Sequence, residues 1–200
     1  KTVITIGRQF GSGGKEIGEK LAKELGIRCY DKELLAVAAK ESGLCKELFE
    51  NHDEKPTNSF LYSLVMDTYS LGYTSSYSDM PINHKVFLAQ FDAIKKLAER
   101  ESCVIIGRCA DYALEDNPYA MSIYIKADMD KRVKRIMTKY QLKDTIVKAD
   151  KKRASYYNYY SSKKWGDAKS YDLCLDSGKL GVEGSIELIK DFIALREKNF

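Results

Sequence analysis

Residues 7–16 read GRQFGSGGKE, and this stretch decides how the rest of the chain is interpreted. It follows an apolar run, VITI at residues 3–6, which is typical of a short buried strand. Apolar residues Ile17, Leu21 and Leu25 then recur at helical spacing. A glycine-rich turn between a buried strand and a helix is a setting in which backbone N–H groups bind phosphate.

The phosphate-loop pattern GxxxxGK[ST] is matched only in part. Gly14 and Lys15 supply its GK, but Gln9 stands where the first glycine belongs and Glu16 where the Ser or Thr belongs. In a second register, residues 11–13 align with the GSG of GxSGSGK, and Gly14 takes the place of the lysine. Both registers keep the strand–loop–helix context and lose the hydroxyl that would bind Mg²⁺.

We interpret the loop as a phosphate site, because four glycines within eight residues directly follow a buried strand. Lys15 is the candidate cation for the β- and γ-phosphates of a nucleotide. Glu16 is a candidate Mg²⁺ ligand, directly or through water, although a carboxylate there would also repel phosphate. The alternative is a turn that only joins strand to helix. The predicted phosphate-binding residues are Gly11, Ser12, Gly13, Gly14, Lys15 and Glu16.

The bulk composition predicts one globular domain. The chain has 200 residues, of which 44% are hydrophobic and 31% charged. Its five cysteines are scattered, without the spacing of a zinc site, and Cys103 and Cys174 lie in apolar runs where buried thiols are expected. We find no apolar run long enough to span a membrane and no signal peptide, so a reducing cytoplasm is expected.

Positive charge is concentrated in residues 126–169, which hold fourteen Lys or Arg against five Asp or Glu. Such a segment favours a partner with concentrated negative charge, either phosphates on a small molecule or nucleic acid. A solvated basic helix face is the alternative. The tyrosines 156, 157, 159 and 160 could stack on bases, but packing is the more usual role, and nucleic acid is the least favoured partner.

The alternation of apolar strands with helical patterns predicts an α/β fold with a parallel sheet. Residues 52–81 are the least regular part and are interpreted as an insertion with one helical candidate near residues 59–69. Strands are expected at residues 1–6, 27–30, 102–106, 120–125 and 171–176. Helices are expected at residues 17–25, 32–41, 83–100, from 128 onward, 143–160 and 185–198.

Charged residues follow two of the predicted strands, at the edge where open α/β sheets bind ligands. Arg108 comes directly after the strand at residues 102–106, where its guanidinium could bind a phosphate or merely cap a turn. Asp111 lies close behind it. Asp31, at the end of the second strand, could contact a hydroxyl of an acceptor or cap the next helix, and the sequence leaves these two roles open.

Three arginines in the basic segment could gather on a phosphoryl group. Arg132 and Arg135 are one helical turn apart, and Arg153 follows in the next predicted helix. Arginines that converge on a transferring phosphoryl group stabilise its charge. We therefore treat the three as candidate catalytic residues, with a solvated helix face as the alternative.

Five motifs together resemble the cytidylate kinase-like proteins, relatives of bacterial cytidylate kinase among the nucleoside monophosphate kinases. They are ITIGRQFGSGGKEIG, IIGRCADY, the R-x-x-R helix, KKRASYYNYY and YDLCLDS. The resemblance implies a three-layer P-loop kinase fold, with a five-stranded parallel sheet between helices. It also implies an acceptor-binding insertion at about residues 51–82 and a helical lid at about residues 128–169. The core would comprise residues 1–50, 83–127 and 170–200.

The resemblance further implies an ATP-dependent kinase that moves the γ-phosphate of MgATP to a nucleoside monophosphate, CMP first. ATP and Mg²⁺ would be its cofactors, and a small-molecule nucleotide rather than a membrane its partner. Catalysis would fall to Lys15, Arg132, Arg135 and Arg153, and acceptor binding to Asp31, Arg108 and Asp111. The alternative is a nucleotide-binding regulatory or sensor protein without phosphoryl transfer, which the loss of the hydroxyl at Glu16 favours.

Overall fold

Five parallel strands form one sheet in the order β2-β3-β1-β4-β5. The computed structural model describes residues 1–43, 51, 81–137 and 143–199. The strand that precedes the glycine-rich loop, β1, is therefore central, between β3 and β4. The strands are β1 (Val3–Arg8), β2 (Arg28–Tyr30), β3 (Cys103–Ile106), β4 (Ala120–Lys126) and β5 (Leu173–Asp176).

The register of the central strand decides where the loop emerges. Pairing of β1 with β3 ends at Ile6 opposite Ile106, whereas pairing with β4 continues to Arg8 opposite Ile125. The chain thus leaves the sheet along β4, at the carboxyl end of the strands. Ligands of open α/β sheets bind at this edge.

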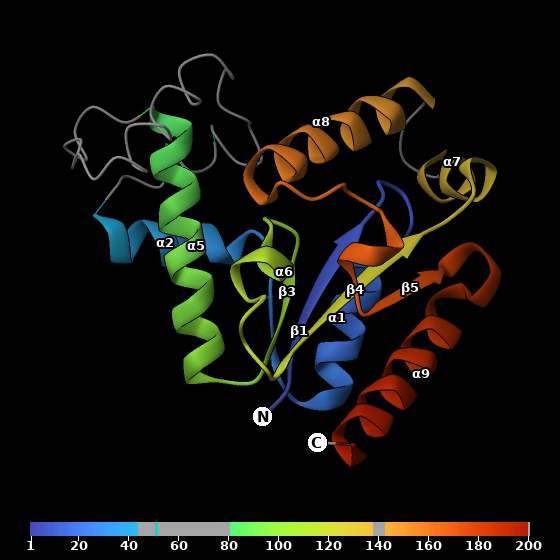
Figure 1. The fold of residues 1–200 in the computed structure, drawn as a ribbon. Helices are drawn as coiled ribbons and strands as arrows, with labels where there is room; N and C mark the ends of the chain where they lie inside the picture. The colour runs from blue at the N-terminus through green and yellow to red at the C-terminus, as the bar shows by residue number, and fades with distance from the viewer. Residues whose placement is uncertain (44–50, 52–80, 138–142, 200) are drawn as a thin grey trace.

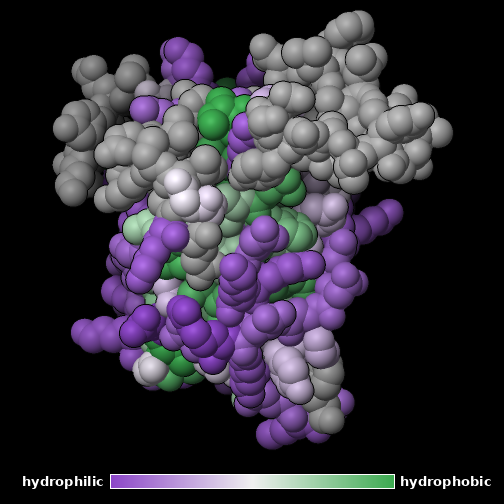
Figure 2. All heavy atoms as spheres, turned by 90° about the vertical axis from the view of Figure 1, so that its left-hand side faces the viewer, coloured by the Kyte–Doolittle hydropathy of each residue, from purple (hydrophilic) through white to green (hydrophobic). Residues whose placement is uncertain are grey.

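Helices cover both faces of the sheet, which gives three layers (Figure 1). Successive strand residues point to opposite faces, so Ile4 and Ile6 pack against α1 (Gly14–Leu25) and α9 (Ser177–Lys198). Val3 and Ile105 pack on the other face against α2 (Glu33–Ser42), α5 (Ile82–Arg100) and the short α6 (Ala110–Ala113). Hydrophilic side chains form much of the outer layer where α2 and α5 lie, with apolar atoms showing between them (Figure 2).

Two helices, α7 (Met129–Met137) and α8 (Lys143–Ser161), lie at the carboxyl end of the strands, at the opposite end of the sheet from both termini (Figure 1). Tyrosines anchor the end of α8. Tyr156, Tyr157 and Tyr160 are buried, and the Tyr160 ring stacks on Phe87 of α5 with centroids 3.9 Å apart. These three tyrosines therefore serve packing rather than base stacking. A short 3-10 turn, η2 (Ala168–Ser170), leads into β5.

Most predicted strands and helices lie within about three residues of those observed, but the closing helix was placed too late. It begins at Ser177 rather than at residue 185, because the Asp176 carboxylate caps it by accepting the Gly178 N–H at 2.9 Å. Gly181, with φ at 72°, kinks the helix. Glycines in the first turns interrupt the apolar periodicity, so the sequence pattern did not predict those turns.

One thiol is also placed differently from the prediction. Cys103, in β3, is buried as expected. Cys174 is exposed because it lies in the edge strand β5, on the opposite face from Leu173 and Leu175, which pack in the core with α9. The insertion predicted at about residues 51–82, with its helical candidate, falls almost wholly outside the described residues. Within the described part of the chain, no helix has the length and apolar character needed to cross a membrane.

Candidate functional site

The loop between β1 and α1 contains two glycines that the backbone requires. Gly11 has φ at 79° and Gly13 at 81°, in the left-handed region that L side chains rarely adopt. Both positions are also crowded. A Cβ atom on Gly11 would lie 2.6 Å from Cδ1 of Ile136, and one on Gly13 would lie 3.1 Å from Nη1 of Arg135. The loop therefore passes directly under α7.

The loop presents the positive end of α1 to its surroundings. Ile17 N–H donates to the Gly13 carbonyl at 2.9 Å, which begins the helical hydrogen bonding. The N–H groups of Gly14, Lys15 and Glu16 lie in the first turn, where a helix offers no carbonyl to them. Such a turn is an anion site, because its N–H groups and the helix dipole both favour negative charge.

A cavity of about 570 Å³ opens beside the loop and the first turn of α1. Among the described residues that line it, six are cationic and three are anionic, so the cavity favours an anionic ligand. The lining residues are Arg8, Gln9, Phe10, Gly11, Gly13, Gly14, Lys15, Glu16, Glu19, Asp31, Lys32, Arg108, Arg135 and Arg153.

An ionised carboxylate joins two cations across this cavity. The Lys15 Nζ atom lies 2.9 Å from Oδ2 of Asp31, and Nη1 of Arg108 lies 3.1 Å from Oδ1. Burial acts to raise the pKa of Asp31, but the hydrogen bonds and charges of Lys15 and Arg108 outweigh it, and the pKa lies below its ordinary value. The hydrogen bond from Asp31 raises the pKa of Lys15 in turn. Of the two roles left open for Asp31, these contacts favour a site carboxylate over a helix cap.

The two cations differ in their freedom to move. The Arg108 side chain is 2% exposed, and its Nη1 also donates to the Ile106 carbonyl at 3.1 Å. Its guanidinium is therefore fixed at the back of the cavity. The Lys15 side chain is 55% exposed, so Nζ can leave Asp31 for a bound anion without losing much buried contact.

Asp111 is not brought to this cavity. Its carboxylate accepts the Tyr157 hydroxyl at 2.6 Å and lines a separate cavity of about 340 Å³ with Lys163 and Tyr171. Burial raises the pKa of Asp111. The separation follows from α6, which turns the chain away from the sheet edge directly after Arg108.

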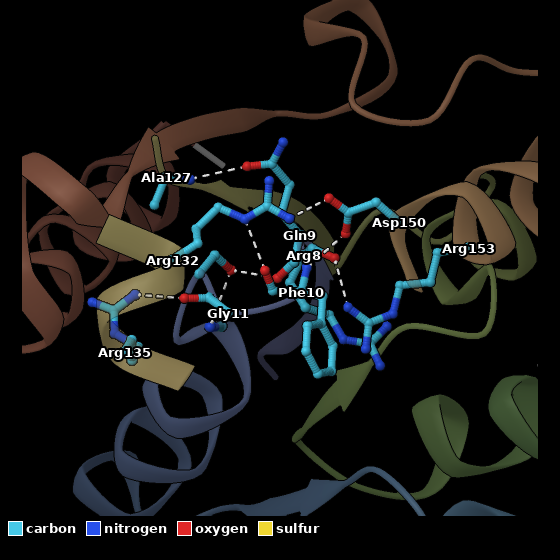
Figure 3. Close-up of polar contacts among 11 residues, drawn as sticks. Arg8, Gln9, Phe10, Gly11, Ala127, Arg132, Arg135, Asp150 and Arg153 are labelled. Atoms are coloured by element: carbon cyan, nitrogen blue, oxygen red, sulfur yellow. Dashed lines mark hydrogen bonds and ion pairs between the residues drawn. The ribbon is translucent and has the colours of Figure 1, made fainter. Parts of the chain in front are cut away.

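The three candidate arginines all reach the loop, but in different ways (Figure 3). Arg135 donates from Nη1 to the Gly11 carbonyl at 3.0 Å, and Arg153 donates to the Arg8 carbonyl at 3.3 Å. Both line the cavity. Arg132 is buried, donates from Nε to the Phe10 carbonyl at 2.8 Å and is absent from the cavity lining among the described residues.

Sequence reasoning missed several residues of the site. Arg8 ends β1 and lines the cavity, and the rule that selected Arg108 at the end of β3 would have found it. Lys32 follows Asp31 directly and lines the same cavity. Asp150 pairs with Arg132, and its place three residues before Arg153 was the only signal.

The donor groups fit a nucleoside polyphosphate. The first-turn amides and the cationic lining suit phosphate oxygens. Mg²⁺ is commonly held by one or two carboxylates together with substrate phosphates. Glu16 lines the cavity and could supply one, although its Oε1 lies 3.2 Å from Lys20 Nζ, whereas Asp31 is already paired with Lys15 and Arg108. No cluster of three or more His, Cys, Asp or Glu suited to a metal occurs among the residues described.

A central strand, a glycine-rich loop and a helix N-terminus beside a five-stranded parallel sheet define the P-loop kinase class of fold. The family model described as the cytidylate kinase-like family matches residues 3–179. The chain belongs to this family. No curated protein matches the chain.

Solved structures share this fold. An uncharacterized protein from Eubacterium ventriosum ATCC 27560 is 31% identical, with a TM-score of 0.69 over 97% of this chain and 99% of that one. Shikimate kinase from Bacteroides thetaiotaomicron has 16% identity and a TM-score of 0.55, covering 96% of this chain and 98% of its own. A gluconokinase from Sinorhizobium meliloti 1021 has 13% identity and a TM-score of 0.56, covering 99% and 94%. The last two show the fold alone, and with the family they support a kinase.

Proposed function

We propose that the protein is an ATP-dependent small-molecule kinase that transfers the γ-phosphate of MgATP to a nucleoside monophosphate, with a CMP-like acceptor first. The observation that carries the proposal is the row Lys15–Asp31–Arg108 across the cationic cavity, next to the first turn of α1. It brings a mobile cation, an ionised carboxylate and a fixed cation together in one cavity.

On the donor side, the N–H groups of residues 13–16 would bind the phosphates of ATP. Lys15 would leave Asp31 and neutralise the β- and γ-phosphates. Arg135 and Arg153, which also line the cavity, would neutralise charge on the moving phosphoryl group. Bound Mg²⁺ would supply further charge neutralisation at the phosphate oxygens, held with the help of Glu16. In this arrangement α7 and α8 act as the lid.

On the acceptor side, Arg8, Lys32 and Arg108 surround Asp31 and suit an acceptor that itself carries phosphate. Asp31 would accept a hydrogen bond from a hydroxyl of that acceptor. Asp111 enters only if the acceptor extends past Arg108 toward Arg153 and Tyr157, since these residues line one small cavity between the two sites.

A second acceptor class is favoured by the same carboxylate. An ionised Asp31 repels an acceptor phosphate but accepts a hydrogen bond from an alcohol, and so could orient a hydroxyl for attack. The structural neighbours named as shikimate kinase and gluconokinase make hydroxyl-bearing acids the natural candidates. Transfer to a hydroxyl would keep every donor-side role unchanged.

A nucleotide-binding regulator without transfer is the remaining class, favoured by Glu16 in the place of the Mg²⁺-binding hydroxyl. It would bind MgATP without acceptor-dependent turnover.

The test is ADP formation from MgATP with CMP, dCMP, UMP, AMP, GMP, shikimate and gluconate as separate acceptors. Lys15→Ala should abolish turnover, whereas Lys23→Ala, an exposed lysine in the last turn of the same helix, should not. Turnover with one acceptor class identifies the substrate class. MgATP binding without ADP from any acceptor would refute a kinase acting on these substrates and favour the regulator.

A further inference from the structure

Every backbone carbonyl of residues 8–13 accepts a hydrogen bond from the protein. Those of residues 9 and 13 are bonded locally, by Ser12 and by Ile17 N–H. The Ser12 carbonyl accepts the Ser177 hydroxyl of α9. The other three, of Arg8, Phe10 and Gly11, accept from arginines of α7 and α8. Because these carbonyl oxygens are engaged within the protein, they repel a bound anion less than free carbonyls would.

One residue of the loop is held at both of its polar backbone groups. Phe10 N–H donates to Oδ1 of Asp150 at 2.7 Å, and the Phe10 carbonyl accepts from Nε of Arg132 at 2.8 Å. Asp150 Oδ2 and Arg132 Nη2 pair with each other, which closes a ring of three residues from the loop, α7 and α8 (Figure 3). The ring spans contacts 122 and 140 residues apart in the chain.

The Arg132–Asp150 ion pair contacts the loop and lies outside the lining of the cavity. The Arg132 side chain is 5% exposed and that of Asp150 is 17% exposed, and neither lines the cavity. The Phe10 ring does line it, with the Arg153 guanidinium 5.5 Å from the ring centroid (Figure 3). Fixing the Phe10 peptide groups therefore fixes a wall of the cavity and the entry into Gly11.

We propose that the Arg132–Asp150 ion pair is a positioning device, which holds the phosphate loop in its anion-binding form through the peptide groups of Phe10. Arg132 is then a positioning residue, and charge neutralisation at the phosphates falls to Lys15, Arg135 and Arg153. The inference rests on the proposed function only in naming MgATP as the anion.

The test compares Asp150→Asn with the wild type in the free protein and with MgATP. Asn cannot keep both the charge and the two acceptor oxygens, so we expect amide hydrogen exchange at Phe10 to accelerate by about tenfold or more. Exchange at Ile4 and Ile6 in β1 reports overall stability and should not change by a comparable factor. The dissociation constant for MgATP, measured by calorimetry, should rise by about tenfold. Asp144→Asn, at an exposed aspartate of the same helix, is the matched control and should change neither.

Arg132→Lys provides a second variant should Asp150→Asn fail to fold. Lysine keeps the charge opposite Asp150 but lacks the planar fork that also reaches the Phe10 carbonyl. We expect MgATP affinity to fall and Phe10 exchange to rise, both less than in Asp150→Asn. Unchanged Phe10 exchange, or faster exchange with unchanged MgATP affinity, would overturn the inference. Absence of MgATP binding in the wild type would instead refute the proposed function, and exchange at Phe10 would then decide the role of the pair.

Discussion

The Nζ atom of Lys15 and Oδ2 of Asp31 lie 2.9 Å apart, so the lysine of the loop and the acid after β2 form an ion pair across the cavity. Asp31 also accepts from Arg108 at 3.1 Å, and two cations thus share one carboxylate. In the proposed function, an incoming polyphosphate would compete with Asp31 for Lys15. The Lys15–Asp31 ion pair therefore keeps the Lys15 ammonium group charged and oriented beside the site where it would act.

Asp31→Asn tests this relationship. Loss of the carboxylate removes the competitor for Lys15, so MgATP should bind as tightly as before or more tightly. Turnover should nevertheless fall by about 10²-fold or more, because the acceptor loses its hydrogen-bonding group. The measurements are the dissociation constant for MgATP and kcat with the best acceptor. Glu19→Gln is the control, since Glu19 also approaches Lys15, at 3.5 Å, from an exposed position. Equal kcat in Asp31→Asn and the wild type would contradict the acceptor role.

The partly buried carboxyl of Asp111 should make stability depend on pH. Burial raises its pKa in the folded protein above the unfolded value of about 3.9, so the folded state binds the proton more tightly. The resulting cost is absent below the unfolded pKa and grows as pH rises through the folded pKa. We expect Asp111→Asn, which can still accept the Tyr157 hydroxyl, to gain stability relative to the wild type at pH 7 and to lose that gain near pH 3. Urea unfolding at the two pH values measures the difference, and a gain of equal size at both would contradict the assignment.

Gly13→Ala should damage the site more than the fold. An alanine with positive φ costs about 1–2 kcal/mol of stability, and its Cβ would in addition lie 3.1 Å from Arg135 Nη1. We expect MgATP binding to weaken by about tenfold or more, because the loop or the Arg135 guanidinium must move and both line the cavity. Gly26→Ala is the matched control. Gly26 has φ at 66° with no atom within 4 Å of an added Cβ, so it should show the backbone cost with unchanged MgATP affinity. Thermal unfolding and calorimetry together separate the two effects.

The aromatic contacts between α5 and α8 should contribute strongly to stability. Tyr160 is buried, and its ring stacks on Phe87 and lies edge-on to Tyr156 at 5.0 Å between centroids. Tyr160→Ala should lower the free energy of unfolding by about 3–5 kcal/mol, the usual range for a large buried ring. Tyr119→Ala, at a ring that is 54% exposed, should change it by less than about 1 kcal/mol. Chemical denaturation of both variants gives the comparison, and similar losses in the two would show that the Tyr160 ring contributes no special packing.

The sequence predicted those parts of the fold in which local pattern and tertiary packing agree. The periodicity of residues 3–6 and of Ile17, Leu21 and Leu25 predicted β1 and α1, because the faces they mark are those that become buried. The predicted start of α9 was wrong. The glycines in its first turns weaken the helical periodicity, and only the cap at Asp176 marks where the helix begins. The predicted burial of Cys174 was also wrong, because the sequence of one strand does not show whether that strand lies at the edge of the sheet.

The residues of the candidate site also divide into those whose place the sequence predicted and those whose place it did not. Asp31 and Arg108 could be predicted from the rule on strand ends, and they do meet beside Lys15. Asp111 lies elsewhere, because the short α6 redirects the chain. The contacts of Arg132 and Arg135 with loop carbonyls depend on the orientation of individual peptide groups, which neither residue type nor spacing records.

Gln9 occupies the position at which the loop pattern expects a glycine, and its contacts show what the chain gains there. Its N–H donates to the Ile125 carbonyl, and its side-chain Oε1 accepts the Ala127 N–H at 3.0 Å (Figure 3). The pairing of β1 with β4 is thus continued by one residue, first by backbone and then by a side chain that imitates it. At this position a side-chain tether, the hydrogen bond from Ala127 N–H to Gln9, fixes the shape of the loop in place of a flexible glycine. A sequence search that demands glycine here would therefore reject the loop.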